Sequence, residues 1–219
     1  MNNKVKTIIE KIKTKYSNAD TILVFGSATT PDWTPDSDID IFVIDSNSND
    51  EREDIVIDGV IVEIQKDNFS NIKKDIENER GNLHHRNVAT MIDSSEIISS
   101  KSLPEIQNLK DLAKNILDSK TIYTDEDIKM WLYSIEDYLL KAKKDLSRND
   151  EIAFYLDTYY VLKNAIEMLL ATNGLYLPQP KNLANLLQKA DPKFYQIFRS
   201  FAAETDPAKK LKILEQLLP

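Results

Sequence analysis

Residues 21–44, TILVFGSATTPDWTPDSDIDIFVI, decide the fold. The first five residues form a short apolar run that Gly26 ends, which predicts a buried strand. The last seven, DIDIFVI, predict a second strand. Because side chains on a strand point alternately to its two faces, Asp38 and Asp40 share one face and the isoleucine between them takes the other.

A third carboxylate joins this face if the next apolar segment is a neighbouring strand. Residues 60–65 (VIVEIQ) follow Asp58-Gly59, a strong hairpin signal, and predict a strand with Glu63 on its polar face. Side chains that are lateral neighbours on a sheet lie about 5 Å apart, so three such carboxylates would repel one another without a cation between them. Mg²⁺ takes oxygen ligands of this kind. We therefore predict Asp38, Asp40 and Glu63 as metal ligands and catalytic residues.

Gly26 and Ser27 are the candidate nucleotide-binding residues. They follow the first strand directly, where the chain is expected to turn into a helix. Glycine lets the backbone approach a ligand closely, serine adds a hydroxyl donor, and backbone N–H groups at such turns bind phosphate. A phosphate cradle beside clustered carboxylates suits phosphoryl or nucleotidyl transfer, in which two metal ions roughly 4 Å apart hold the attacking and leaving oxygens.

This pattern resembles the polymerase-β-type nucleotidyltransferase superfamily. An apolar strand, Gly-Ser, ten further residues, Asp-Ile-Asp and a later acid between apolar residues occur in that order. The resemblance implies that Asp38 and Asp40 ligate two Mg²⁺ ions, that Glu63 completes one metal site, and that Gly26 and Ser27 hold the triphosphate of an NTP, expected to be ATP. A nucleoside monophosphate would pass to a hydroxyl group and pyrophosphate would leave.

Two features depart from the family pattern. The loop after Gly-Ser, Ala28 to Trp33, contains no basic residue, and the third acid is Glu63 instead of the commoner Asp. Arg86 is a candidate to reach a phosphate from the following helix, the alternative being an ordinary surface arginine.

The chain changes character near residue 100. Residues 1–103 predict an α/β (α+β) nucleotidyltransferase domain with a small mixed sheet, with helices at about 3–16, 69–79 and 83–92, and a polar loop at 45–54. Residues 104–219 predict a helical bundle with long helices at 125–146 and 151–172, which we expect to bind the acceptor; the boundary is expected within 100–122. This layout is similar to that of kanamycin and other antibiotic nucleotidyltransferases, and that similarity suggests a homodimer.

The bundle offers carboxylates that could act as general base. An acceptor hydroxyl must lose a proton, and Asp157 and Glu136 are the candidates, with Asp137 and Glu167 as further acids. Asp157 lies among aromatic residues, which we expect to be bundle core more than a substrate platform. The alternative for each acid is a solvated helix face. His84 and His85 are too few for a zinc site.

Composition limits the class of substrate. The chain has 219 residues, a net charge of -8 and no cysteine. Without a basic face, a long nucleic acid is not the expected partner. No apolar run reaches the length of a membrane span, and a soluble cytoplasmic protein is expected. The acidic surface suits a cationic acceptor held between the domains.

Three hypotheses follow for function. The first is transfer to a small molecule such as an aminoglycoside-type antibiotic. The second is a protein acceptor, as in antitoxin-like adenylyltransferases that modify a tyrosine. The third is a decayed, non-catalytic nucleotide-binding module. The absence of a basic residue after Gly26-Ser27 favours this hypothesis, and the retained acidic residues oppose it.

Overall fold

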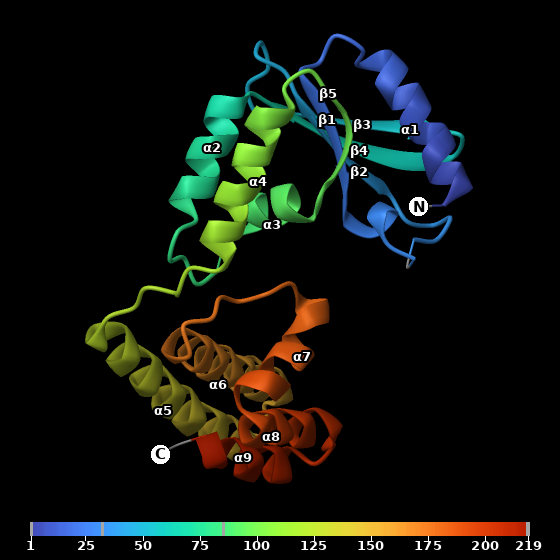
Figure 1. The fold of residues 1–219 in the computed structure, drawn as a ribbon. Coiled ribbons are helices and arrows are strands. Elements are labelled where there is room, and N and C mark those ends of the chain that lie inside the picture. Colours follow the sequence, from blue (N-terminus) through green and yellow to red (C-terminus); the bar gives the residue numbers. More distant parts are fainter. Residues whose placement is uncertain (1, 32, 85, 218–219) are drawn as a thin grey trace. The chain divides into compact units, whose positions relative to one another are not determined.

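A computed structural model describes residues 2–31, 33–84 and 86–217 of the chain (Figure 1). The chain forms two compact units. The first comprises residues 1–80 and 86–119, and the second comprises residues 81–85 and 120–219.

The first unit is built on a five-stranded mixed sheet. Strand order is β3-β4-β2-β1-β5, and only β2 and β4 are parallel neighbours. This confirms the predicted α+β class. The strands are β1 (Thr21–Phe25), β2 (Ile39–Ile44), β3 (Glu51–Ile57), β4 (Val60–Asp67) and β5 (Glu96–Ser100).

One face of the sheet packs against helix α1 (Asn3–Lys15), which lies alone on its side of the sheet in Figure 1. The helix is amphipathic, and its apolar stripe joins the odd-numbered apolar residues of β2 and the even-numbered ones of β4 in one core. The face parity predicted from the sequence is therefore confirmed. The buried residues are Val5, Ile8, Ile9, Ile12, Ile39, Ile41, Val43, Val60, Val62 and Ile64.

The opposite face is covered by α2 (Phe69–Asn78), α3 (Asn87–Ser94) and α4 (Leu103–Leu117). They pack over β1 and β2, where Leu23, Phe42 and Ile44 are buried. Helix α4 thus belongs to the sheet unit. The units divide after Ser119, beyond α4, because the apolar stripe of this helix is buried against α2 and α3.

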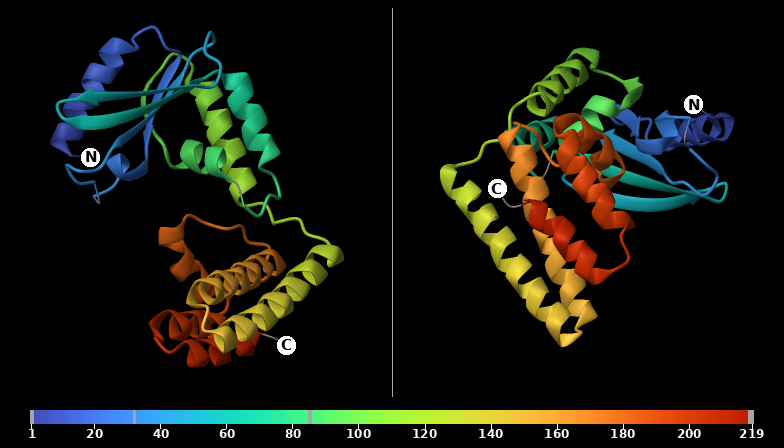
Figure 2. Two further views of the ribbon diagram at one scale, coloured as in Figure 1. Left: turned by 180° about the vertical axis from the view of Figure 1, so that it is seen from behind. Right: turned by 90° about the horizontal axis from the view of Figure 1, so that it is seen from below.

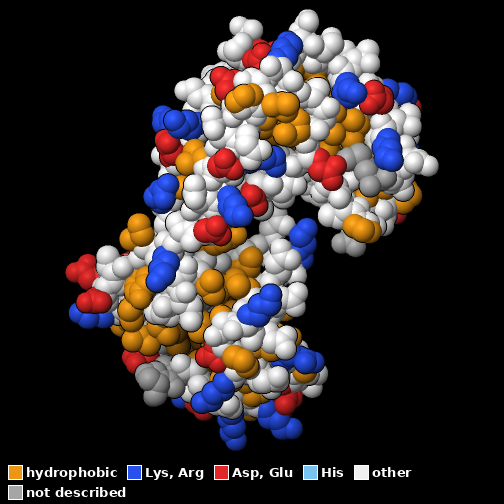
Figure 3. All heavy atoms as spheres, viewed as in Figure 1, with side chains coloured by type: hydrophobic (Ala, Val, Ile, Leu, Met, Phe, Trp, Pro, Cys, Tyr) orange, Lys and Arg blue, Asp and Glu red, His pale blue; other side chains and the backbone are white. Residues whose placement is uncertain are grey.

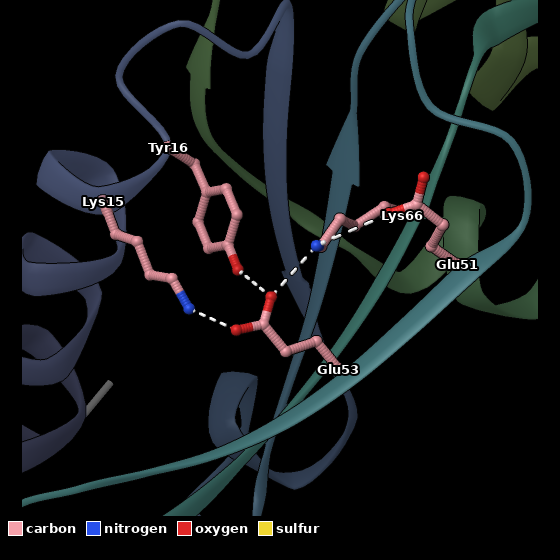
Figure 4. A network of polar contacts seen from close by, with 5 residues as sticks. All are labelled: Lys15, Tyr16, Glu51, Glu53 and Lys66. Atoms are coloured by element: carbon pink, nitrogen blue, oxygen red, sulfur yellow. Dashed lines mark hydrogen bonds and ion pairs between the residues drawn. The ribbon is translucent and has the colours of Figure 1, made fainter.

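Two predicted segments differ in the structure. Residues 51–54, expected as part of a polar loop, form the first half of β3. Their polar sequence is typical of a loop, but here they form a strand. Glu53 points to the α1 side, where the sheet face ends in charged groups instead of core. There its carboxylate accepts a hydrogen bond from Lys15 and another from the Tyr16 hydroxyl at 2.7 Å (Figure 4). It also forms an ion pair with Lys66 at 3.0 Å. The helix expected at 83–92 begins only at Asn87.

The second unit is helical, as predicted. Helices α5 and α6 lie side by side as a long hairpin (Figure 2), and shorter helices pack against it. A capping box between Thr124 and Asp127 starts α5. The helices are α5 (Asp125–Arg148), α6 (Glu151–Thr172), α7 (Pro180–Ala190), α8 (Pro192–Ala203) and α9 (Pro207–Leu214).

A short segment from the middle of the chain completes the second unit. Leu83 is buried in the core formed with α6 and α7. The Gly81 carbonyl accepts from Ile122 N at 2.9 Å, and the Leu83 carbonyl accepts from Leu177 N at 2.7 Å. The connection between α2 and α3 is thus part of the helical core. Over residues 2–31, 33–84 and 86–217, the structure has no helix that is both long and apolar enough to cross a membrane.

Candidate active site

Three carboxylates converge on one face of the sheet, near the start of β2. Asp40 on β2 is the direct register partner of Glu63 on the parallel strand β4, and Asp38 lies just before β2. One oxygen from each of the three lies within 4.8 Å of the others. Asp38 is exposed and the other two are half-buried. The convergence expected from strand parity is therefore present, and the donors are carboxylate oxygens, which hard divalent cations prefer.

Gly26 lies directly beneath the Asp40 carboxylate. Strand β1 runs antiparallel to β2 and pairs Phe25 with Asp40, so the next residue turns the chain beside the cluster. Gly26 has φ +69°, and a Cβ built on it would lie 2.1 Å from Asp40 Oδ2. Two requirements, a left-handed backbone and a close approach, thus coincide at this glycine.

Ser27 belongs to a single 3-10 turn, η1 (Gly26–Thr29), where the sequence predicted a turn into a helix. Threonine hydroxyls stabilise this turn: Thr29 Oγ1 donates to the Gly26 carbonyl at 2.9 Å, and Thr30 Oγ1 donates to the Ser27 carbonyl at 3.0 Å. Both carbonyls therefore accept hydrogen bonds from within the loop. Backbone N–H groups and the Ser27 hydroxyl are the donor types such a turn can present to an anion.

Trp33 fixes the chain just before the two aspartates. Its ring is buried in the α1-side core, and its Nε1 donates to the Asp38 carbonyl at 3.1 Å. The loop between the Gly-Ser turn and β2 is thereby held by an indole at the point where Asp38 begins the cluster. The sequence offered no signal for this contact beyond a tryptophan in a polar loop.

Arg52 is a basic residue of the site that the sequence analysis missed. Its Nη2 donates to Glu63 Oε2 at 2.8 Å, and its Nε donates to Asp54 Oδ1 at 3.3 Å. Asp54 first, and then the charges of Glu63 and Asp40, raise the pKa of the Arg52 guanidinium. The residue was hidden in the segment predicted as a loop, and only the β3–β4 register brings it to the cluster.

Arg86 has a different place from either predicted alternative. It is 2% exposed, so it is not a surface arginine. Its Nη1 donates to the carbonyls of Ile116 at 2.6 Å and Ser119 at 2.7 Å, at the C-terminal end of α4. The last carbonyls of a helix lack the donor that the next turn would supply, and a cation there also meets the negative end of the helix dipole. The structure thus gives Arg86 a stabilising role in the first unit.

The helical carboxylates differ in environment. Glu136 is exposed, whereas Glu167 is buried and pairs with His84 Nε2 at 3.0 Å. Burial, and next a hydrogen bond with Asp145, raise the pKa of Asp157. His85 lies outside the described residues. Of the aromatic residues around Asp157, only Phe154 is core; the tyrosines are exposed, contrary to expectation, at positions Tyr155, Tyr159 and Tyr160.

Comparison with known proteins agrees with this geometry. The family described as "Nucleotidyltransferase domain" matches residues 5–157. Among solved structures, a nucleotidyltransferase-like protein from Exiguobacterium sibiricum 255-15 has a similar fold, with a TM-score of 0.52 and 12% identity over 96% of this chain and 73% of that one. No curated protein matches the chain. The family match covers well over half of the sequence, and the chain belongs to the nucleotidyltransferase domain family of the polymerase-β-like superfamily.

Proposed function

We propose that the chain is a Mg²⁺-dependent nucleotidyltransferase that moves a nucleoside monophosphate from an NTP, most simply ATP, to a hydroxyl of a small molecule such as an aminoglycoside-type antibiotic. The observation that carries the proposal is the cluster of Asp38, Asp40 and Glu63 within 4.8 Å. It lies beside a glycine turn, in a chain of the nucleotidyltransferase domain family.

The residues of the cluster fit a divalent cation. Three formal negative charges within 4.8 Å repel one another, and a hard cation with oxygen ligands relieves that repulsion. Asp38 and Asp40 would hold the ions, and Glu63 would complete one of the sites. Bound there, the ions would supply charge stabilisation for the α-phosphate and for the attacking and leaving oxygens.

The order of the strands suggests how the substrates lie. Gly26 follows β1, Asp40 is on β2 and Glu63 is on β4, and these strands are consecutive in the sheet. With the triphosphate at the Gly26-Ser27 turn, the leaving pyrophosphate is on the β1 side. The attacking hydroxyl must enter roughly in line with it, from the opposite side. The acceptor would therefore approach over β4 and β3.

Asp157 is the carboxylate that we propose as general base, in preference to Glu136. Its pKa is raised by burial and by the hydrogen bond with Asp145, and a base with a raised pKa accepts a proton more readily. Glu136 is exposed and has the properties of a solvated helix residue.

A protein acceptor is the second candidate function. Large hydrophobic side chains are exposed on α5 and α6, and orange side chains gather on the surface of the helical unit in Figure 3. Exposed apolar surface of this kind is typical of protein contacts. The residues, each more than half exposed, are Met130, Tyr133, Leu140, Ile152, Leu156 and Tyr159. On the same face of the molecule, basic and acidic side chains are interspersed, without the basic stripe that a long nucleic acid requires.

Pyrophosphate release tests the proposed reaction. The purified protein, with Mg²⁺, ATP and a panel of hydroxyl-bearing cationic acceptors, is expected to release pyrophosphate, and Asp40→Asn is expected to abolish this release. With labelled ATP in a lysate, a labelled small molecule supports the first candidate and a labelled protein band the second. Tight Mg²⁺-ATP binding in calorimetry without turnover on any acceptor contradicts both and supports a decayed site.

A further inference from the structure

We infer that Arg52 is a built-in counter-cation of the carboxylate cluster, which a divalent ion must displace from Glu63, so that this arginine sets the metal affinity of the site. The metal site itself rests on the proposed function. The competition between the arginine and the ion rests on the geometry of the β3–β4 hairpin.

Arg52 pairs with one of the three carboxylates of the cluster. Its Nη2 lies 2.8 Å from Glu63 Oε2, close enough for a charge-assisted hydrogen bond. Glu63 is also one of the three carboxylates whose oxygens come within 4.8 Å of one another. A carboxylate held by a guanidinium on one side has less negative charge to offer a metal ion. Arg52 thus offsets one of the three formal charges of the cluster.

A second carboxylate can pair with the guanidinium after a metal ion has displaced it from Glu63. Asp54 lies two residues further along β3, on the same sheet face, and already accepts from Arg52 Nε at 3.3 Å. The register places Asp54 opposite Glu63. The arginine side chain is 65% exposed, so it can rotate without disturbing the core. When an ion takes Glu63, Arg52 can keep its pair with Asp54 as it leaves.

The size of the effect follows from the exposure of the pair. Exposed ion pairs contribute little, and a cation beside a bound divalent ion adds a modest repulsion where water screens both charges. Removing the charge of Arg52 should therefore tighten metal binding by about three- to tenfold. If Arg52 instead acted only as a ligand for the triphosphate, its loss would weaken Mg²⁺-ATP binding and leave the binding of the metal alone unchanged.

Calorimetric titration of Mn²⁺ alone into the full-length protein tests the inference. Arg52→Gln is expected to lower the Kd for Mn²⁺ by about three- to tenfold. Lys11→Gln is the matched control: it removes one positive charge from another exposed ion pair, Lys11–Asp58 at 2.7 Å, whose lysine lies on α1. This control is expected to change the Kd by less than about twofold.

A double-variant cycle identifies the partner. In a Glu63→Gln background, where Mn²⁺ binds more weakly, the further change Arg52→Gln is expected to lose most of its effect. Circular dichroism checks that each variant is folded. An unchanged or weaker Mn²⁺ affinity in Arg52→Gln, or an effect equal to that of Lys11→Gln, overturns the inference. If the Arg52 effect is present but no acceptor is ever nucleotidylated, the counter-cation stands and the proposed function fails.

Discussion

Replacing Gly26 by alanine tests whether the glycine exists to make room for Asp40. The added Cβ would lie 2.1 Å from Asp40 Oδ2, where an ordinary van der Waals contact is about 3.4 Å or more. The carboxylate would have to move by more than about 1 Å, away from the position that brings it to Asp38 and Glu63. The change thus acts on the cluster without removing any of its acids.

The expected magnitude has two parts. The left-handed backbone of Gly26, with φ +69°, costs an alanine roughly 1–2 kcal/mol. The displacement of Asp40 acts on activity, since an error of about 1 Å in a reacting group can reduce the rate by on the order of 10²-fold. We therefore expect a small loss of stability and a large loss of turnover.

Gly59→Ala is the matched control. Gly59 also has a positive φ, +77°, but nothing lies within 4 Å of an added Cβ. It should lose about the same stability, roughly 1–2 kcal/mol in urea unfolding, and keep its rate of pyrophosphate release and its Mn²⁺ affinity. If Gly26→Ala keeps full activity, or if both variants lose activity equally, the reasoning about Gly26 and Asp40 is refuted.

Two further predictions concern titrating carboxylates. Hydrogen bonds from Lys15, then Tyr16 and Lys66, lower the pKa of Glu53 to about 2, so its stabilisation is complete above the unfolded value of about 4.5 and is lost as pH falls from there toward 2. Because Glu53 is partly exposed, Glu53→Gln should lower the free energy of unfolding by only about 1 kcal/mol at pH 7. In that pH window, the free energy of unfolding measured in urea should depend less on pH in the variant than in the wild-type protein. An unchanged pH dependence contradicts this. Asp157→Asn should lower kcat by roughly 10²–10⁴-fold with an unchanged KM for ATP, and the wild-type rate should fall with decreasing pH as Asp157 is protonated; a variant with the wild-type pH profile excludes it as the base.

The parts of the fold that follow local rules could be predicted from the sequence. Apolar runs bounded by turn residues identified β2 and β4, and the two-residue period of a strand gave the faces of their side chains. Asp58 and Gly59 both have positive φ, as a two-residue hairpin turn requires, and this pair fixed the β3–β4 connection. Once these strands were neighbours, the meeting of the three carboxylates followed.

The parts that depend on long-range contacts could not be predicted. Half of β3 is an edge strand with charged side chains on both faces, and nothing in its local pattern distinguishes it from a loop. Arg52 was not predicted as a site residue, because it lies in this half of β3. The charge of Arg86 predicted either a phosphate contact or a surface position. Its burial depends instead on the end of α4, thirty residues away in the chain. Helix α4 carries an ordinary amphipathic stripe, and such a stripe does not say which core it joins.

The central claim, nucleotidyl transfer at the cluster of Asp38, Asp40 and Glu63, is tested most directly by the position of the label in ATP. The protein is incubated with Mg²⁺, an acceptor-containing lysate and ATP labelled at either the α- or the γ-phosphate. Label is expected to reach the acceptor from the α-phosphate alone, and Asp40→Asn is expected to abolish the transfer. Transfer from the γ-phosphate, or α-label transfer that persists in Asp40→Asn, would contradict the claim.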